Sequence, residues 1–408
     1  MSVVIVGTLD TKTEEIGFAR DVLEAQGLDV HIVDAGVMGE PGSAVDPETT
    51  AKEVAEAAGT TLENLREDAD RGEAIEAMGE GATAIAERLH EEGVLDGVLG
   101  LGGSGNTSIA TAAMRALPVG VPKLMVSTMA SGDTEPYVGP RDIAMLYSVA
   151  DIEGLNQLSR RIIANAALAM SGMVANEPDV DVEDRPTIAI TMFGVTTPCV
   201  QTARERLEEK GYETIVFHAT GTGGRAMESL VEEGVVDGVL DVTTTEWADE
   251  LVGGVLSAGP DRLEAAGDEG IPQVVSTGAL DMVNFGPRDS VPEEFEERQF
   301  HVHNPQVTLM RTTPEENAEL GEIIAQKLND ATGPTALVLP LEGVSAIDIE
   351  GEDFHDPEAD EALFDALRTT LGDDVEHIEV ETDINDDVFA EELAETIDEY
   401  MRDVGHVP

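Results

Sequence analysis

The chain has 408 residues, of which 84 are acidic and 23 basic, so its formal net charge is −61. Its 41% hydrophobic content, arranged in recurring apolar runs, excludes a disordered acidic protein, and so acidic a surface would repel the phosphates of nucleic acids. Because the acidic residues are spread along the whole chain instead of forming a partner-binding tail, we interpret the charge as adaptation to high salt.

The sequence also limits the compartment and the kind of site. No apolar run approaches the roughly 20 residues that cross a bilayer, and the chain opens on a strand-like run instead of a secretory leader. Its single cysteine, Cys199, excludes a disulfide framework and a thiolate zinc site. We therefore expect a cytoplasmic protein without a membrane partner, a nucleic-acid partner or a metal site of its own.

Along the first half of the chain, short β-branched runs alternate with helical patterns. We predict strands over residues 3–7, 31–36, 94–103 and 123–128. Helical patterns follow the first strand to Gln26 and extend over about 107–117 and 142–175. This alternation indicates βαβ units and a parallel sheet covered by helices. The acidic segment 177–186, which contains two prolines, is the expected linker.

The second half repeats the alternation and then extends it. We predict strands over residues 187–193, 213–221, 235–242 and 273–277. Thr313 and Glu316 form a capping-box pattern that begins a helix ending near Leu328. A strand over 335–341 and a helix opened by Asp356 follow.

Three blocks recur in the same order, which indicates an internal duplication. EEGVLDGVL at 91–99 returns as EEGVVDGVL 141 residues later, and DVLEAQG at 21–27 returns as ERLEEKG 184 residues later. VPKLMVST at 121–128 corresponds to IPQVVST at 271–277. The offsets differ by 43 residues, the size of an extra segment between Asp34 and Glu91 in the first copy. We therefore predict an α/β fold of two tandem parallel-sheet domains, residues 1–176 and 187–408.

In open parallel sheets, ligands bind beyond the carboxyl ends of the strands, so we expect the ligand-binding residues at those positions. After the first strand, Thr8, Asp10 and Lys12 provide a hydroxyl, a carboxylate and an ammonium suited to phosphate or to phosphate-bound Mg²⁺. A glycine-rich loop after the third strand leads into a helix, a context that favours phosphate binding although it is neither a Walker A loop nor a strict dinucleotide fingerprint. Its candidate residues are Gly102, Gly103, Ser104, Gly105, Asn106 and Thr107, with Ser131 and Gly132 at the next strand end.

The second copy has its own set of polar residues at strand ends. Cys199 is expected in the first turn of a helix, His218 at a strand end and Glu246 after the next strand, which permits Cys–His nucleophilic or His/Glu acid–base catalysis. The alternative for Cys199 is a small buried core residue. Candidate substrate-binding residues are Thr197, Gly221, Gly223, Gly224, Arg225 and Ser276.

Several of these segments together resemble the Tm-one-like ATP-binding family, an uncharacterised group of bacterial, archaeal and plant proteins. They include TLDTK, GLGGSGNTS, VSTMASGD, FGVTTPC and FHATGTGGRAME, and the resemblance runs from residue 2 to about residue 400. It implies two Rossmann-like domains, a homodimer and ATP binding, with the phosphates near Gly102 to Thr107 and with Thr8, Asp10 and Lys12 adjacent.

Three functional hypotheses follow from the sequence. The first is an enzyme that uses ATP and Mg²⁺ on a small metabolite held in a cleft between the domains. The second is a nucleotide-independent hydrolase, lyase or isomerase that uses Cys199 and His218. The third is a nucleotide-gated binding or regulatory protein without turnover.

Overall fold

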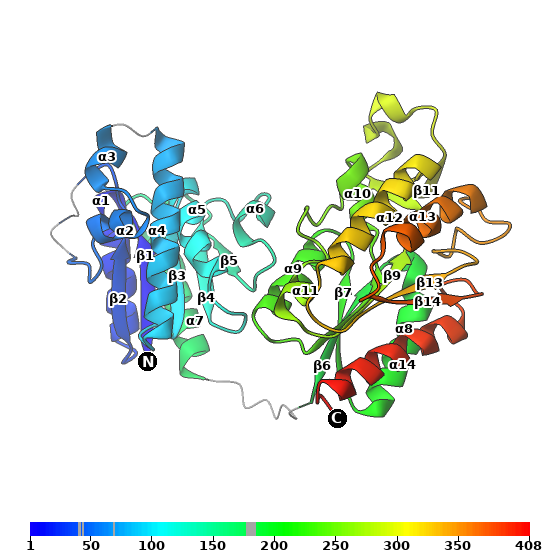
Figure 1. Cartoon of the computed structure of the whole chain (residues 1–408). Helices are drawn as coiled ribbons and strands as arrows, with labels where there is room; N and C mark the ends of the chain where they lie inside the picture. Colours follow the sequence, from blue (N-terminus) through cyan, green and yellow to red (C-terminus); the bar gives the residue numbers. More distant parts are fainter. Residues whose placement is uncertain (40–41, 43–44, 68–69, 177–184) are drawn as a thin grey trace. The chain divides into compact units, whose positions relative to one another are not determined.

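The computed structural model describes residues 1–39, 42, 45–67, 70–176 and 185–408. The chain divides into two compact units, Met1–Asp181 and Val182–Pro408, and each has its own parallel sheet (Figure 1). Most of the expected linker, residues 177–184, lies outside the described residues. Among the described helices, none is both long enough and apolar enough to cross a membrane.

The first unit is a five-stranded sheet with helices on both faces. Its strands are β1 (Ser2–Gly7), β2 (Asp29–Asp34), β3 (Gly97–Gly102), β4 (Lys123–Ser127) and β5 (Ala144–Tyr147). Its helices are α1 (Leu9–Glu24), α2 (Ala51–Ala57), α3 (Leu62–Glu67), α4 (Arg71–Glu91), α5 (Ser104–Arg115), α6 (Glu135–Val138) and α7 (Gln157–Ala175). The strands run parallel in the order β2-β1-β3-β4-β5.

Two apolar layers hold this unit together, because alternate strand residues point to opposite faces of the sheet. Val3 and Ile5 of β1 pack with α1 and α7, whereas Val4 and Val6 pack with α2, α4 and α5. The sheet is therefore covered on both faces, and the carboxyl edges of its strands remain for the loops that carry polar residues.

The second unit has a six-stranded parallel sheet and a small antiparallel one. Its strands are β6 (Thr187–Met192), β7 (Glu213–His218), β8 (Gly238–Thr243), β9 (Gln273–Gly278), β10 (Met282–Phe285), β11 (Phe300–Asn304), β12 (Val307–Arg311), β13 (Thr335–Pro340) and β14 (Glu376–Val380). Its helices are α8 (Thr197–Lys210), α9 (Thr222–Glu232), α10 (Glu246–Val252), α11 (Ala265–Glu269), α12 (Pro314–Asn329), α13 (Pro357–Thr370) and α14 (Asp387–Asp403). The large sheet has the order β14-β13-β9-β8-β6-β7, and the small sheet the order β10-β12-β11.

The two large sheets share one topology, as the sequence repeats predict. The order β2-β1-β3-β4 of the first unit matches β7-β6-β8-β9 of the second. The repeated block, EEGVLDGVL in one unit and EEGVVDGVL in the other, leads into β3 and β8 respectively. The predicted α/β class with two parallel-sheet, Rossmann-like domains is confirmed. The extra segment of the first copy forms α2, α3 and most of α4.

Some predicted boundaries were wrong. The helix expected from about residue 142 begins at Gln157, because Ala144–Tyr147 forms the edge strand β5 and a loop follows it. Helix α5 begins at Ser104, three residues before the predicted start, so the glycine loop is itself the first turn of the helix. The antiparallel sheet β10-β12-β11 was not predicted. The capping box at Thr313 and the Asp356 cap are confirmed.

The close packing of α4 against α2 is testable with a glycine pair. A Cβ on Gly81 would lie 2.0 Å from the carbonyl oxygen of Val54, whereas a Cβ on Gly172 of α7 would meet nothing within 4 Å. We expect Gly81→Ala to lower the free energy of unfolding by roughly 2–3 kcal/mol, and Gly172→Ala to raise it by roughly 0.5–1 kcal/mol. Urea unfolding measures both, and equal effects of the two variants would contradict this packing.

Candidate functional site

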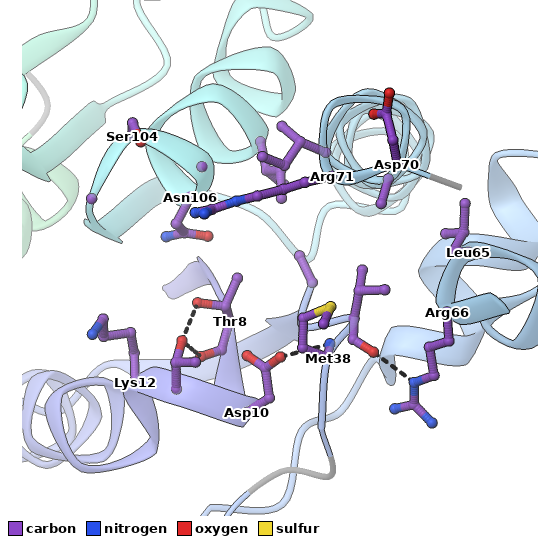
Figure 2. Close-up of a pocket in the computed structure, with 18 of the residues that line it drawn as sticks. Thr8, Asp10, Lys12, Met38, Leu65, Arg66, Asp70, Arg71, Ser104 and Asn106 are labelled. Atoms are coloured by element: carbon purple, nitrogen blue, oxygen red, sulfur yellow. Dashed lines mark hydrogen bonds between the residues drawn. The ribbon is translucent and has the colours of Figure 1, made fainter. Parts of the chain in front are cut away.

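The β1 and β3 strand ends predicted to bind phosphate line one cavity of about 580 Å³ in the first unit (Figure 2). They meet because β1 and β3 are neighbours in the sheet, so the turns after them open side by side. Thr8 is the N-cap of α1, Asp10 and Lys12 lie at the start of that helix, and Gly103 to Asn106 come from the start of α5. Further walls come from the segment after β2, from α3 and from the first turns of α4.

The start of α5 presents backbone N–H groups to this cavity. Gly103 is the N-cap and has no side chain to accept from them, and the first N–H groups of any helix lack a partner within it. The helix dipole adds a partial positive charge at the same place, which favours an anion. A Cβ on Gly103 would have Thr128 Oγ1, at 3.8 Å, as its nearest neighbour, so packing does not require glycine at this position.

Two of the cations that line the cavity are Lys12 and Arg71. Neither forms an ion pair with any residue that the structure describes. Lys12 interrupts α1 with a non-helical backbone, at φ −126° and ψ 21°. Arg71 is the first residue of α4, and its side chain extends across the cavity toward Asn106 (Figure 2). A third cation, Arg66, is held by the carbonyl oxygens of Val37 and Gly39, at 2.6 and 2.9 Å.

Two of the three carboxylates that line the cavity, Asp10 and Asp70, have structural partners, and the third is the exposed Asp151. Asp10 Oδ2 accepts a hydrogen bond of 2.9 Å from the backbone N–H of Met38 and so fixes the segment after β2. Asp70 caps α4 by accepting from the N–H groups of Gly72 and Glu73. The opposite side of the cavity is apolar, and its side chains are Val37, Met38, Leu65, Ala74, Ile75 and Ile109.

The remaining predicted residues of the first unit lie behind or outside this lining. Thr107 is fully buried and its hydroxyl donates to the carbonyl of Gly103 and contacts Ser127 Oγ, so it supports the loop from behind. Gly102 is also structural, because a Cβ there would lie 2.7 Å from the Cβ of Asn106. Ser131 and Gly132 lie on an exposed turn after β4 and do not line the cavity.

Sequence reasoning missed Arg66 and Arg71. Both belong to the extra segment of the first copy, which has no counterpart in the repeat to mark it. The signal available was their rarity, because arginines stand out in a chain with 23 basic residues among 408.

In the second unit, the glycine-rich loop is occupied by the protein itself. Glu246 Oε1 accepts hydrogen bonds from the N–H groups of Gly221 and Gly224, at 2.6 and 3.1 Å. A Cβ on Gly224 would lie 2.1 Å from the same carboxylate, and a Cβ on Gly223 would lie 1.8 Å from the carbonyl oxygen of His218. The expectation that this loop is open to an anion is therefore not met. The glycines make room for contacts within the unit.

Arg262 lies at the centre of the same network and is 2% exposed. It binds both oxygens of Asp241, at 2.5 and 2.8 Å, and also Glu246 at 2.8 Å and Glu228 at 3.0 Å. Burial raises the pKa of the Glu246 carboxyl above its ordinary value, and the guanidinium of Arg262 opposes that rise. The arrangement compensates a buried charge, which is a structural role. Arg225 is also engaged, since its guanidinium donates to the carbonyl of Ser257.

Of the two residues proposed for Cys–His catalysis, Cys199 is buried and His218 is exposed at the end of β7. Cys199 is 1% exposed and packs in the apolar core between the sheet, α8 and α14. Burial, with a smaller contribution from the charge of Asp383, raises the pKa of its thiol and so disfavours the thiolate that nucleophilic catalysis by Cys199 requires. The ring of His218 packs edge-on against Phe193, with 5.5 Å between ring centroids.

The other two residues proposed for substrate binding, Thr197 and Ser276, lie at the start of α8 and within β9. The hydroxyl of Thr197 donates to the carbonyl of Phe193 at 3.1 Å, which closes the first turn of α8. Ser276 is fully buried within β9, where its carbonyl accepts from Thr244 and its Oγ has no hydrogen-bond partner among the described residues. Ser276 is therefore enclosed, whereas Thr197 is half-buried.

The burial of Cys199 predicts an unreactive thiol. We expect iodoacetamide to modify it in the native protein at least roughly 100-fold more slowly than in the urea-unfolded chain, because a protonated, enclosed thiol is a poor nucleophile. Mass spectrometry of the alkylated protein measures both rates. Rapid modification of the folded protein would revive the thiol as a candidate nucleophile.

Comparison with known proteins places the chain in a family. The models of the N-terminal and C-terminal domains of the uncharacterised protein family UPF0261 match residues 1–179 and 185–401, so the chain belongs to this family. A UPF0261 protein of Clostridium tetani is 55% identical over 401 residues, which cover 98% of this chain and 99% of that protein. A UPF0261 protein of Rhizobium meliloti is 50% identical, over 95% of this chain and 96% of that protein.

The resemblance seen in the sequence is confirmed by a plant relative. The tomato mosaic virus resistance protein Tm-1(GCR237) of Solanum lycopersicum is 42% identical over 98% of this chain and 56% of its own length. The chain thus spans about half of that tomato protein. Among solved structures, the UDP-GlcNAc 2-epimerase of Methanocaldococcus jannaschii matches at 12% identity with a TM-score of 0.22, over 67% of this chain and 83% of that one. A likeness that weak carries no argument about function.

Proposed function

We propose that this member of the UPF0261 family binds ATP with Mg²⁺ in the first-unit cavity, as an enzyme that uses ATP on a small metabolite. One observation carries the proposal. The uncapped start of α5 opens into a cavity that also contains Lys12 and Arg71, two cations that form no ion pair with the residues the structure describes. Cavities of roughly 300–1,000 Å³ are usual for small-molecule sites, and this one is about 580 Å³.

The cationic end of the cavity suits a polyphosphate. Backbone N–H groups at a helix start bind phosphate oxygens directly, and an ammonium and a guanidinium add charge-assisted hydrogen bonds. Such groups are needed here, because the chain as a whole carries −61 and repels a tetra-anion. Lys12 and Arg71 supply that local attraction from α1 and α4, on either side of the α5 start.

The apolar end suits an adenine ring. Val37 and Met38 face it from the segment after β2, Leu65 from α3 and Ile75 from α4. The positions of Val37 and Met38 are fixed by Asp10 and Arg66 through their backbone groups. An aromatic base that leaves water for such a wall gains the hydrophobic effect, while its triphosphate reaches the polar end.

Mg²⁺ fits this site as a partner of the nucleotide. Within the described residues, no group of three or more His, Cys, Asp or Glu side chains is arranged to hold a metal ion. Mg²⁺ is usually bound through substrate phosphates and one or two carboxylates, so Asp10 and the hydroxyl of Thr8 are the protein oxygens suited to it. When bound, Mg²⁺ would neutralise phosphate charge and polarise the terminal phosphate.

The glycine at the α5 start provides the test of this proposal. We expect Gly103→Asp to weaken ATP binding at least roughly 100-fold, because a carboxylate would occupy the start of α5 and repel the phosphates. The fold has room for the new Cβ, with nothing nearer than 3.8 Å. Isothermal titration calorimetry measures the affinity, and thermal unfolding checks the fold.

The matched control is Gly172→Asp on α7, which adds the same charge to the same unit where a Cβ meets nothing within 4 Å. It should bind ATP as the unchanged protein does. Wild-type affinity in Gly103→Asp, or no ATP binding by the unchanged protein, would overturn the assignment.

We further propose that the net charge of −61 reflects adaptation to high salt. Raising KCl from 0.1 to 1 M shortens the Debye length from about 10 Å to about 3 Å and removes most of the repulsion among surface carboxylates. The melting temperature should therefore rise by roughly 5–10 °C over this range. Differential scanning calorimetry measures it, and a melting temperature that falls or does not change would contradict the interpretation.

A further inference from the structure

Asn106 fixes the floor of the cavity. It is the third residue of α5 and is 6% exposed. Its side-chain nitrogen Nδ2 donates to the carbonyl of Leu101 on β3 at 2.6 Å and to that of Val6 on β1 at 3.4 Å. One side chain thus joins the ends of the two strands from which the cavity opens.

These two hydrogen bonds fix which way the amide points. If the amide were flipped, its oxygen would face two carbonyl oxygens, and none of these three atoms can donate a hydrogen bond. The nitrogen therefore belongs against the strands and Oδ1 on the other side. In the part of the chain that the structure describes, Oδ1 is enclosed and has no hydrogen-bond partner.

The surroundings are built around this side chain. A Cβ on Gly102 would lie 2.7 Å from the Cβ of Asn106, so the strand end needs a glycine to admit it. Arg71 extends across the cavity toward Asn106 (Figure 2) and makes no hydrogen bond to Oδ1. A buried acceptor without a partner destabilises the folded state, so an unpaired oxygen on the lining of a cavity indicates a missing donor.

We propose that Asn106 Oδ1 accepts a hydrogen bond from an O–H donor that binds beside the phosphates. This inference rests on the proposed nucleotide site, because the α5 start places the phosphates next to Asn106. A phosphate oxygen is itself an acceptor near neutral pH and cannot be the partner. The O–H belongs to a water held by Mg²⁺ or to a hydroxyl of the bound ligand.

The test compares two isosteric changes on α5. Asn106→Leu removes the oxygen together with two buried hydrogen bonds, and Thr111→Val removes the buried bond from Thr111 to the carbonyl of Thr107, away from the cavity. Both should lower the melting temperature without ligand. Calorimetric titration with ATP, in Mg²⁺ and in EDTA, then separates a binding role from a structural one.

We expect Asn106→Leu to weaken binding of Mg²⁺–ATP at least tenfold and Thr111→Val to leave it unchanged. If the donor is a water on Mg²⁺, the difference between Asn106→Leu and wild type disappears in EDTA. If it is a ligand hydroxyl, the difference persists in EDTA and shrinks with 2′- or 3′-deoxy-ATP. Equal affinity of Asn106→Leu and wild type under all conditions would overturn the inference and leave the nucleotide site standing.

Absence of ATP binding by the wild type would instead remove the proposed function. A crystal structure of the wild-type protein then decides the role of Asn106 separately. A water or ligand oxygen within hydrogen-bond distance of Oδ1 supports a donor site at this position. An Oδ1 paired with a protein group, or facing no density, rejects it.

Discussion

The hydrogen bonds from the Asn106 amide to Val6 and Leu101 are the interaction on which the first unit's cavity depends. In a parallel sheet of order β2-β1-β3-β4-β5, the chain leaves β1 toward one edge and β3 toward the other, so the helices that follow them separate at this point. Asn106 holds the two strand ends at fixed positions below that gap. The start of α5, Thr8 and Lys12 are then oriented as a consequence of the backbone.

The second copy has different residues at the equivalent strand ends. The 141-residue offset of β3 and β8 places Glu246 at the position that corresponds to Gly105. The first copy leaves the start of α5 open to a cavity, whereas in the second copy the Glu246 carboxylate accepts from N–H groups at the start of α9. A buried carboxylate needs compensation, and Arg262 supplies it together with a bond to Asp241. The second copy thus contains its own anion and its own cation, which explains why its glycines resemble those of an anion-binding loop.

The sequence predicts where strands end, but it does not predict whether a glycine loop is open or filled. The β-branched runs and the glycines that follow them predicted the strand ends to within three residues, because both signals are local. Whether a glycine loop is open or filled depends on a side chain more than 20 residues away, as Gly224 and Glu246 show. The same limit applies to Cys199, since its thiol pKa is set by the burial that α14 imposes from the far end of the chain. Strand β5 was missed because four residues at a sheet edge carry little periodicity.

The extra segment of the first copy supplies part of the lining of the first-unit cavity. Its helix α3 supplies Leu65 and Arg66, and the start of α4 supplies Arg71 and Ile75. At the ionic strength of a cell the Debye length is about 8 Å, so most of the chain's carboxylates act weakly on a ligand at this site. The groups that line the cavity decide its charge. Its basic residues are Lys12, Arg66 and Arg71, and its acidic residues are Asp10, Asp70 and Asp151. The oxygens of Asp10 and Asp70 already accept from backbone N–H groups. An acidic protein can therefore offer basic side chains and helix-start N–H groups to an anion, provided that its few basic residues are placed at the carboxyl edge of the sheet.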